Sequence, residues 1–239
     1  MRGFKKYMAK LILLACQPKS GSTFLSQYIS KVGGGRPYSF VPGFGRREQE
    51  LSALGLLRAK IRRDKFLVGQ HHVRCSDETL KLIRRFDMAV IILRRNLFDA
   101  VASLRDHIRG GRHIMPMLYL SKEMTAISDS DLEVALARFA VPWYLNFHMS
   151  WRDYTNAIFV DYEQIRTDAR GTTENILKTF GLTFDVGNVE PDIRKSSRFN
   201  VGVAGRGALI APEALQIIRD QVSFYLRFAD DDYLQQHLS

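Results

Sequence analysis

Four short runs of apolar residues divide the chain, and within them hydrophobic positions are continuous rather than alternating with polar ones. They cover residues 10–16, 66–70, 88–94 and 156–161. A continuous apolar run of this length is typical of a strand that is covered on both faces, as in a parallel sheet. These runs therefore predict four buried strands.

Segments with an apolar residue at every third or fourth position separate these runs or follow the last one, as one buried face of a helix requires. The residues on these predicted faces are Phe24, Leu25, Tyr28 and Ile29, then Leu97, Val101, Leu104 and Ile108, then Leu132, Leu136 and Phe139, then Ile176, Leu177 and Phe180, and finally Leu215, Ile218, Val222 and Leu226. Gly181 is predicted to cap one helix end, and Pro212 to begin the last helix. Strands that alternate with helices predict a three-layer α/β/α domain with a mostly parallel sheet.

The composition is that of an ordinary globular protein, with 46% hydrophobic and 25% charged residues. The 17 Gly, 7 Pro and 2 Cys exclude collagen-like, disordered and disulfide-scaffold classes. No internal repeat or low-complexity linker interrupts the sequence, so we expect a single domain over residues 1–239. Cys16 and Cys75 lack the spacing of a zinc site or a disulfide framework, and the first residues lack a signal-peptide cleavage pattern. A cytoplasmic protein without an integral membrane segment is therefore expected.

Basic residues outnumber acidic ones by ten, 35 against 25. Such a surplus favours an anionic partner and carries no information about fold. A dense basic cluster covers residues 58–65, and we expect it to form a solvated surface at the end of a helix, in preference to a ligand site.

The sequence Pro-Lys-Ser-Gly-Ser-Thr at residues 18–23 falls where the first predicted strand ends and the first helix begins. Unpaired N–H groups at a helix start attract a phosphate, and Gly21 allows the backbone to approach it closely. Lys19 adds a positive charge, and hydroxyl groups come from Ser20, Ser22 and Thr23. The order differs from a Walker A motif, because the lysine precedes the only glycine. The turn is predicted to bind phosphate, and the alternative is a plain capped helix.

A second polar turn follows the third predicted strand. Asn96 can cap the next helix, and Asp99 is predicted to reach back to it as in a capping box. Arg95 follows the carboxyl end of the strand, and Ser103 lies on a polar face of the helix. The two side chains can therefore bind one phosphate together. The alternative is a surface arginine beside a capped helix.

Both turns resemble motifs of the sulfotransferases that use 3′-phosphoadenosine 5′-phosphosulfate (PAPS) and release adenosine 3′,5′-bisphosphate (PAP). Pro18-Lys19-Ser20-Gly21-Ser22-Thr23 resembles the loop PKSGTTW that binds the 5′-phosphosulfate, and Arg95 and Ser103 match the residues that bind the 3′-phosphate. A C-terminal segment, residues 199–206, is similar to the family's RKGxxGDW segment, although Asn200 and Val201 replace its basic pair. The resemblance implies a P-loop-NTPase-like fold, with further donor contacts from Arg198, Gly202 and Arg206.

The same resemblance implies sulfuryl transfer to a hydroxyl or amine of an acceptor such as a carbohydrate or a small molecule, without a metal ion. Lys19 then stabilises the leaving phosphate, and Ser103 either shares this role or holds Lys19 before the donor is cleaved. A base must take the acceptor proton. His72, 23 residues before Arg95, is the first candidate, and His71 is a near-equal alternative.

Two other functions remain open. A P-loop kinase that uses ATP and Mg²⁺ is favoured by Asp161, which follows an apolar strand as a Walker B aspartate does. The charge also permits a basic nucleic-acid-binding protein, but no nucleic-acid-binding motif is present, so we expect no nucleic-acid partner. Trp143, Tyr144 and Phe147 are expected in the core, His107 and His148 receive no role, and the oligomeric state is not predicted.

Overall fold

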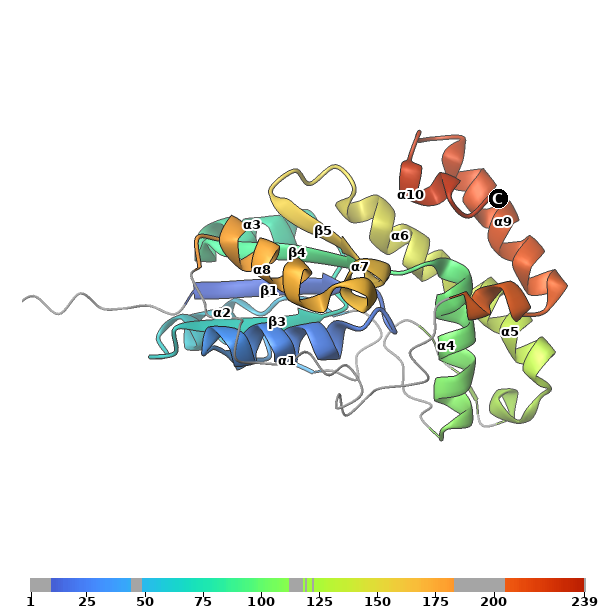
Figure 1. Ribbon diagram of the computed structural model, residues 1–239, viewed down its shortest axis with the longest axis horizontal. Helices are drawn as coiled ribbons and strands as arrows, with labels where there is room; N and C mark the ends of the chain where they lie inside the picture. The colour runs from blue at the N-terminus through green and yellow to red at the C-terminus, as the bar shows by residue number, and fades with distance from the viewer. Residues whose placement is uncertain are drawn as a thin grey trace, which may run out of the picture.

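The computed structural model describes residues 10–43, 49–111, 118, 120–121, 123–182 and 205–238. In this part of the chain, five strands form one sheet in the order β2-β3-β1-β4-β5, and every neighbouring pair is parallel (Figure 1). The strands are β1 (Lys10–Cys16), β2 (Arg36–Pro37), β3 (Phe66–His71), β4 (Met88–Arg94) and β5 (Ala157–Asp161). All four strands predicted from the apolar runs are confirmed, to within one residue at each end. The fifth strand, β2, has only two residues, too few for a periodic pattern.

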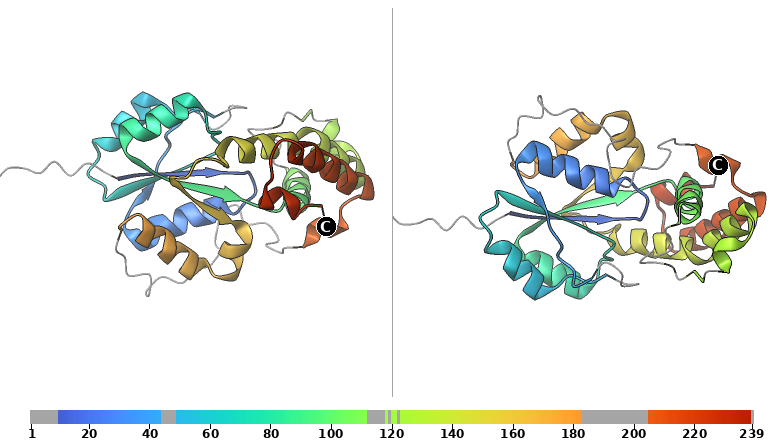
Figure 2. Two further views of the ribbon diagram at one scale, coloured as in Figure 1. Left: turned by 90° about the horizontal axis from the view of Figure 1, so that it is seen from above. Right: turned by 90° about the horizontal axis from the view of Figure 1, so that it is seen from below.

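Helices cover both faces of this sheet (Figure 2). One face carries α1 (Ser22–Gly33), α7 (Tyr162–Thr167) and α8 (Ala169–Thr179), and the other carries α2 (Ala53–Lys60) and α3 (Asp77–Phe86). Alternate residues of β1 supply the two cores, since Ile12 packs with residues of α1 and α8, and Leu13 with residues of α2 and α3. The predicted three-layer α/β/α architecture is therefore confirmed.

A second group of helices lies beyond the carboxyl ends of the strands (Figures 1 and 2). It contains α4 (Leu97–Arg109), η1 (Met124–Ala126), α5 (Asp129–Phe139), α6 (Val141–Trp151), η3 (Arg206–Leu209), α9 (Pro212–Leu226) and α10 (Asp232–Gln235). The predicted inner face of α4 is fully buried. None of the helices within the described ranges combines the length and apolar character that crossing a membrane requires.

Most predicted helix details are confirmed. Pro212 is the first residue of α9, and Gly181 adopts the left-handed conformation just after α8. The basic cluster spans the last turn of α2 and the residues after it, with its side chains mostly exposed. The prediction for Phe139 is wrong, because this residue is 58% exposed at the end of α5, where the chain turns into α6. A residue of the apolar stripe no longer faces the core when the chain changes direction there.

Candidate active site

The first strand-to-helix turn has a backbone suited to an anion. Lys19 and Gly21 both have positive φ values, 61° and 81°. A positive φ is uncommon for a residue with a side chain, and it is tolerated where the surroundings impose it, often at a functional site. Gly21 is the N-cap of α1, so the unpaired N–H groups of the first helical turn open onto this loop.

Gly21 is required for space as well as for conformation. A Cβ atom at this position would lie 2.9 Å from Cδ2 of Tyr162, the first residue of α7. The tyrosine ring therefore packs directly on the backbone of the turn. This close packing fixes the turn against β5 and α7.

Other predicted residues of the turn brace it internally. The Ser20 hydroxyl donates to the carbonyl oxygen of Gln17, and the Tyr144 hydroxyl donates to that of Pro18 at 2.8 Å. The Ser22 hydroxyl oxygen accepts a hydrogen bond of 3.0 Å from the side-chain amide of Gln70 on β3. Thr23 lies half-buried in the first turn of α1. The loop is therefore held in shape by hydrogen bonds to other parts of the protein.

The second turn touches the first. Arg95 follows β4 and is 5% exposed, and its Nη1 donates to the carbonyl oxygen of Lys19 at 2.7 Å. Its guanidinium carbon lies 4.3 Å from the centre of the Tyr162 ring, a cation–π contact. Two residues that lie 76 positions apart in the sequence thus meet at the carboxyl edge of the sheet.

The lysine of the first turn also reaches α4. Lys19 Nζ lies 3.3 Å from Nδ1 of His107, a residue for which the sequence indicated no role. Ser103 is buried on the same helix, one turn before His107. Ser103 and His107 are four residues apart, so both lie on the side of α4 that Lys19 contacts.

The predicted capping pair at the start of α4 is only half correct. The Asn96 side chain accepts from the N–H of Asp99 at 3.2 Å, as predicted. Asp99 does not reach back to Asn96. Its carboxylate accepts instead from the N–H groups of Gly205 and Gly207, at 2.9 and 2.7 Å, because the chain returns across α4 at this point. Asp99 therefore fastens η3 to α4.

This junction predicts a steric effect on stability. A Cβ at Gly207 would lie 2.4 Å from the backbone carbon of Phe98, which cannot move aside without shifting α4. We expect Gly207→Ala to lower the free energy of unfolding by about 1–3 kcal/mol, measured by urea denaturation. Gly43→Ala is the matched control, because a Cβ at that position would have no atom within 4 Å. Equal stability of the two variants would contradict the tight junction.

Of the three C-terminal residues predicted to bind the nucleotide, the structure describes one. Arg198 and Gly202 lie outside the described residues. Arg206 is described, and its Nη1 binds the carboxylate of Asp106 on α4 at 2.5 Å. Asp106 also accepts from Arg105. Arg206 therefore contacts α4 at the residue that precedes His107.

The two candidate bases have different environments. His72 is 8% exposed, and its Nδ1 lies 2.8 Å from the carbonyl oxygen of Cys16. Because a carbonyl only accepts, Nδ1 carries the hydrogen and the lone pair of the ring is on Nε2. His71 is fully buried, and its Nε2 accepts from the N–H of Phe40 at 2.9 Å. Burial, followed by the neighbouring His72, lowers the pKa of His71 to about 3.

Sequence reasoning missed the residue that links the two turns. Gln17 is fully buried, and its Oε1 accepts from the N–H of Arg95 at 2.9 Å. Its Nε2 donates to the carbonyl oxygen of Tyr144 and to the hydroxyl of Tyr233, both at 3.3 Å. Gln17 thus holds the first turn, the second turn and α6 in one arrangement.

The C-terminal tail completes this support. The Tyr233 hydroxyl donates to the carbonyl oxygen of Arg95 at 2.8 Å. Burial raises the pKa of Tyr233, so the hydroxyl keeps its proton and remains a donor. Nε2 of His237 accepts from the N–H of Leu97 at the start of α4, at 3.0 Å. No local sequence pattern marks these residues, because their partners lie more than 130 positions away.

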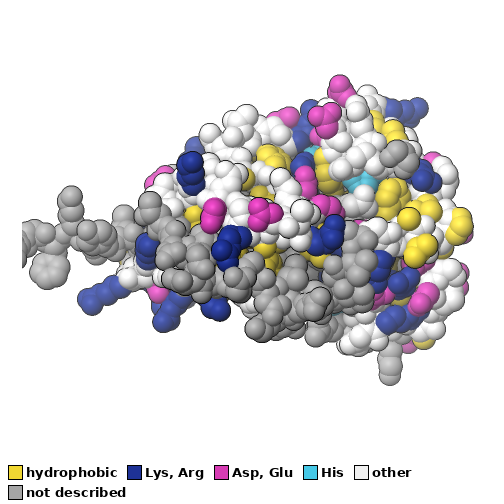
Figure 3. All heavy atoms as spheres, viewed as in Figure 1, with side chains coloured by type: hydrophobic (Ala, Val, Ile, Leu, Met, Phe, Trp, Pro, Cys, Tyr) yellow, Lys and Arg dark blue, Asp and Glu magenta, His cyan; other side chains and the backbone are white. Residues whose placement is uncertain are grey.

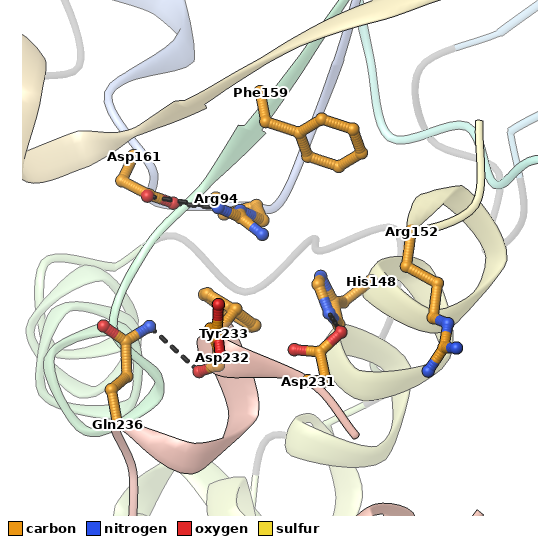
Figure 4. Close-up of a pocket in the computed structure, with 9 residues that line it drawn as sticks. All are labelled: Arg94, His148, Arg152, Phe159, Asp161, Asp231, Asp232, Tyr233 and Gln236. Carbon is orange, nitrogen blue, oxygen red and sulfur yellow. Dashed lines mark hydrogen bonds and ion pairs between the residues drawn. The ribbon is translucent and has the colours of Figure 1, made fainter. Parts of the chain in front are cut away.

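A cavity of about 400 Å³ lies behind the second turn, lined in part by Tyr233 (Figure 4). Asp161 points into it from the end of β5 and accepts from Nε and Nη2 of Arg94 at 2.9 and 3.1 Å. The aspartate that favoured a kinase is therefore engaged by an arginine in a two-bond pair. Among the described residues, no group of three or more His, Cys, Asp or Glu side chains has the arrangement of a metal site.

Comparisons with known proteins give structural matches only. No family model and no curated protein sequence matches this chain. Mouse sulfotransferase SULT7A1 complexed with PAP has a similar structure, with a TM-score of 0.67 and 16% sequence identity, over 96% of this chain and 90% of that one.

Two structures of retinol dehydratase are similar as well. The complex with androsterone and the inactive cofactor PAP has a TM-score of 0.58 and 15% identity, over 93% of this chain and 82% of that one. The complex with retinol and PAP has a TM-score of 0.58 and 16% identity, over 93% and 83%. The predicted sulfotransferase-like α/β fold of this chain is confirmed.

Proposed function

We propose that this protein is a sulfotransferase that transfers the sulfuryl group of PAPS to a hydroxyl or amine of an acceptor. The observation that carries the proposal is the direct contact between the two strand-end turns, from Arg95 Nη1 to the carbonyl oxygen of Lys19 at 2.7 Å. Each turn has the chemistry of a phosphate site, and PAPS carries phosphate groups on both sides of one ribose. Two such sites in contact suit one doubly phosphorylated nucleoside.

The residues of the first turn fit a 5′-phosphosulfate. Residues 18–23 offer the N–H groups of a helix start, two left-handed residues and the ammonium group of Lys19. Successive N–H groups in such a turn form a concave surface that favours an anion. The ring of Tyr162 leaves no room for a side chain at Gly21, so a glycine is required at this position of the turn.

The residues of the second turn fit the 3′-phosphate. Arg95 is fixed on both sides, by Gln17 at its N–H and by Tyr233 at its carbonyl. A guanidinium group presents its donors in a planar fork that suits phosphate oxygens. Ser103 on α4 adds a hydroxyl donor to the same side. The PAP named in the matched structures supports this class of donor.

When bound, PAPS supplies a sulfuryl group attached to a phosphate leaving group. Lys19 would stabilise the negative charge that grows on the bridging oxygen as the bond from sulfur to that oxygen breaks. Its contact with His107 Nδ1 holds the ammonium group towards α4, which makes His107 a positioning residue. The bond from the acceptor oxygen or nitrogen to sulfur forms at the same time, and the acceptor proton goes to a base.

We assign the base to His72. Its Nδ1–H is engaged by the Cys16 carbonyl, which orients the ring and puts the lone pair that takes the proton on Nε2. His71 is less suited, because its Nε2 lone pair already accepts from Phe40 and its pKa of about 3 makes it a weak base. Replacement of His72 should therefore lower turnover far more than replacement of His71 by a side chain that still accepts from Phe40.

A ligand-induced thermal shift tests the proposal against the kinase alternative. PAP at about one hundred times its dissociation constant should stabilise the protein by about 2.7 kcal/mol without any metal ion. ATP with Mg²⁺ at the same concentration should raise the melting temperature less, because the 3′-hydroxyl of ATP carries no charge that Arg95 could bind. Stabilisation by Mg-ATP with no response to PAP would overturn the proposal.

Tyr233 gives a prediction that separates positioning from direct contact. Tyr233→Phe removes the hydrogen bond to the Arg95 carbonyl and the one from Gln17, but keeps the ring. We expect the affinity for PAP to fall by about 0.5–1.5 kcal/mol, roughly 2- to 12-fold, because Arg95 is less well fixed. Affinity for adenosine 5′-phosphate, which lacks the 3′-phosphate, should change much less. Calorimetric titration with both nucleotides measures the difference.

The matched control is Tyr225→Phe, which removes a hydroxyl hydrogen bond of 2.8 Å to Asn146 away from either turn. It should leave both affinities unchanged. An equal loss of affinity for both nucleotides in Tyr233→Phe would contradict a specific effect on Arg95 and would indicate a general loosening of the site.

A further inference from the structure

The outer face of α2 carries apolar side chains that the core does not use. Leu54, Leu57 and Ile61 are 55, 53 and 64% exposed. Their spacing of three and four residues puts them along one side of the helix. The opposite side is already packed, since Leu56 and Ala59 are fully buried in the core with residues of β1. The exposed side chains therefore form a stripe that belongs to neither hydrophobic core.

Basic residues gather at the C-terminal end of this stripe. Arg58 lies on the same side of α2, four residues after Leu54, and the exposed side chains of Arg62, Arg63 and Lys65 follow the helix end. The end of α3 lies beside it, because Lys60 Nζ donates to the carbonyl oxygen of Phe86 at 3.1 Å. That neighbour adds two more exposed arginines, Arg84 and Arg85.

Acidic residues offset only part of this charge. Asp64 pairs with Arg62 at 2.7 Å and with Arg36 at 3.4 Å, and Asp87 follows α3. Lys10 begins β1 at the same edge, where its N–H donates to the carbonyl oxygen of Lys65. Figure 3 shows dark blue Lys and Arg side chains over both ends of the molecule on the face opposite to α2, so we infer the charge near α2 from the residues themselves. The C-terminal end of the stripe thus lies in a strongly positive surrounding.

We propose that the outer face of α2, defined by Leu54, Leu57 and Ile61, docks with its basic surroundings onto an anionic phospholipid bilayer. Aliphatic side chains enter the boundary between headgroups and acyl chains, while Lys and Arg remain at the level of the acidic headgroups. The aliphatic stripe then contacts the acyl chains, and the basic residues contact the acidic headgroups. A nucleic acid would use the arginines and lysines but would leave the aliphatic stripe in water.

The position of this surface is compatible with the proposed sulfotransferase activity. The docking proposal does not depend on that activity. The basic end of α2 lies at the amino ends of the strands, whereas the turns of Lys19 and Arg95 lie at their carboxyl ends (Figure 1). The basic end of the docking surface and the candidate active site therefore lie at opposite edges of the sheet.

Vesicle co-sedimentation of the full chain tests the proposal. At physiological ionic strength, the protein should sediment with vesicles of phosphatidylcholine and phosphatidylserine, and much less with phosphatidylcholine alone. A triple variant, Leu54→Ser with Leu57→Ser and Ile61→Ser, should lower the partition coefficient by about tenfold or more. A charge variant, Arg58→Gln with Arg63→Gln and Lys65→Gln, should have a loss of similar size that vanishes at high salt.

The chain offers a matched control. Phe224 and Phe228 near the end of α9 are 52 and 73% exposed, so they equal the stripe in exposure but lie at the other end of the molecule. Phe224→Ser with Phe228→Ser should leave vesicle binding unchanged. Thermal unfolding of each variant checks that the fold is kept, since every substituted side chain is on the surface.

Three results would overturn the proposal. The first is no binding of the wild-type chain to the anionic vesicles. The second is full binding by the serine triple variant, which together with tight binding to a single-stranded RNA would indicate a nucleic-acid surface. The third is a wild-type dimer in light scattering that the serine variant converts to a monomer, because the stripe would then contact a second copy of the chain.

Discussion

Replacing Lys19 by methionine is expected to lower the turnover number by about 10²- to 10³-fold. The magnitude is that of removing one group that stabilises charge developing in a transition state. Methionine keeps most of the aliphatic stem and removes the ammonium group, which lies 3.3 Å from His107. The measurement is the steady-state rate of sulfuryl transfer from PAPS to an acceptor alcohol or amine that the wild-type protein accepts.

The control for this variant is Lys31→Met, which changes an exposed lysine in the last turn of α1. That variant should have normal turnover. The backbone of the first turn is unchanged in Lys19→Met, so PAP should still bind, with a dissociation constant raised much less than the rate falls. Normal turnover in Lys19→Met would remove the lysine from the mechanism.

Replacing Arg95 by alanine is expected to act mainly on donor binding. A hydrogen bond to a charged group contributes about 1.5–3 kcal/mol, which corresponds to a loss of roughly 10- to 150-fold in affinity for PAP. The variant also loses the contact with the Lys19 carbonyl, so the first turn loses one of its supports. The affinity for PAP is measured by calorimetric titration, and the KM for PAPS should rise in parallel.

The matched arginine is Arg138, whose exposed guanidinium pairs with Glu213 at 2.7 Å on the surface. Exposed pairs of this kind contribute little, so Arg138→Ala should leave both the fold and PAP affinity unchanged. If Arg95→Ala lowered turnover while PAP bound as tightly as to the wild type, Arg95 would not be a donor-binding residue.

The strands and both strand-end turns could be predicted because their signals are local. A buried parallel strand needs a continuous apolar run, which is visible within a few residues. A phosphate-binding turn needs a glycine, hydroxyl groups and a cation just before a helix, and residues 18–23 contain all of them. Each turn follows a strand directly, which predicts that the site lies at the carboxyl edge of the sheet.

Two helices, α3 and α6, are not among those predicted from the sequence, for different reasons. The segment that forms α3 has Ser76 as its N-cap and buries Leu82, Ile83 and Phe86, so a cap and an apolar face were both present in the sequence there. The segment that forms α6 is apolar on most sides, with both Trp143 and Trp151 buried. A helix that is surrounded by protein has no polar face, and its periodicity disappears. Only the core position of its aromatic residues could be predicted.

The supports of the site could not be predicted, because they join distant parts of the chain. Gln17 and Tyr233 are 216 positions apart, and Lys19 and His107 are 88 positions apart. Asp99 shows how a local rule can fail, since a residue placed for a capping box instead binds N–H groups more than one hundred positions later. Tertiary contacts override local preferences where a buried carboxylate accepts from two backbone N–H groups of a distant segment instead of one local N–H group.

The central claim is that the turns of Lys19 and Arg95 hold the two ends of one doubly phosphorylated adenosine. Calorimetric titration with PAP, adenosine 5′-phosphate and adenosine 3′-phosphate tests it most directly, in the wild type and in Arg95→Ala. We predict that the wild type binds PAP at least tenfold more tightly than either monophosphate, and that Arg95→Ala binds PAP and adenosine 5′-phosphate almost equally. A wild-type protein that binds all three nucleotides alike would contradict the account.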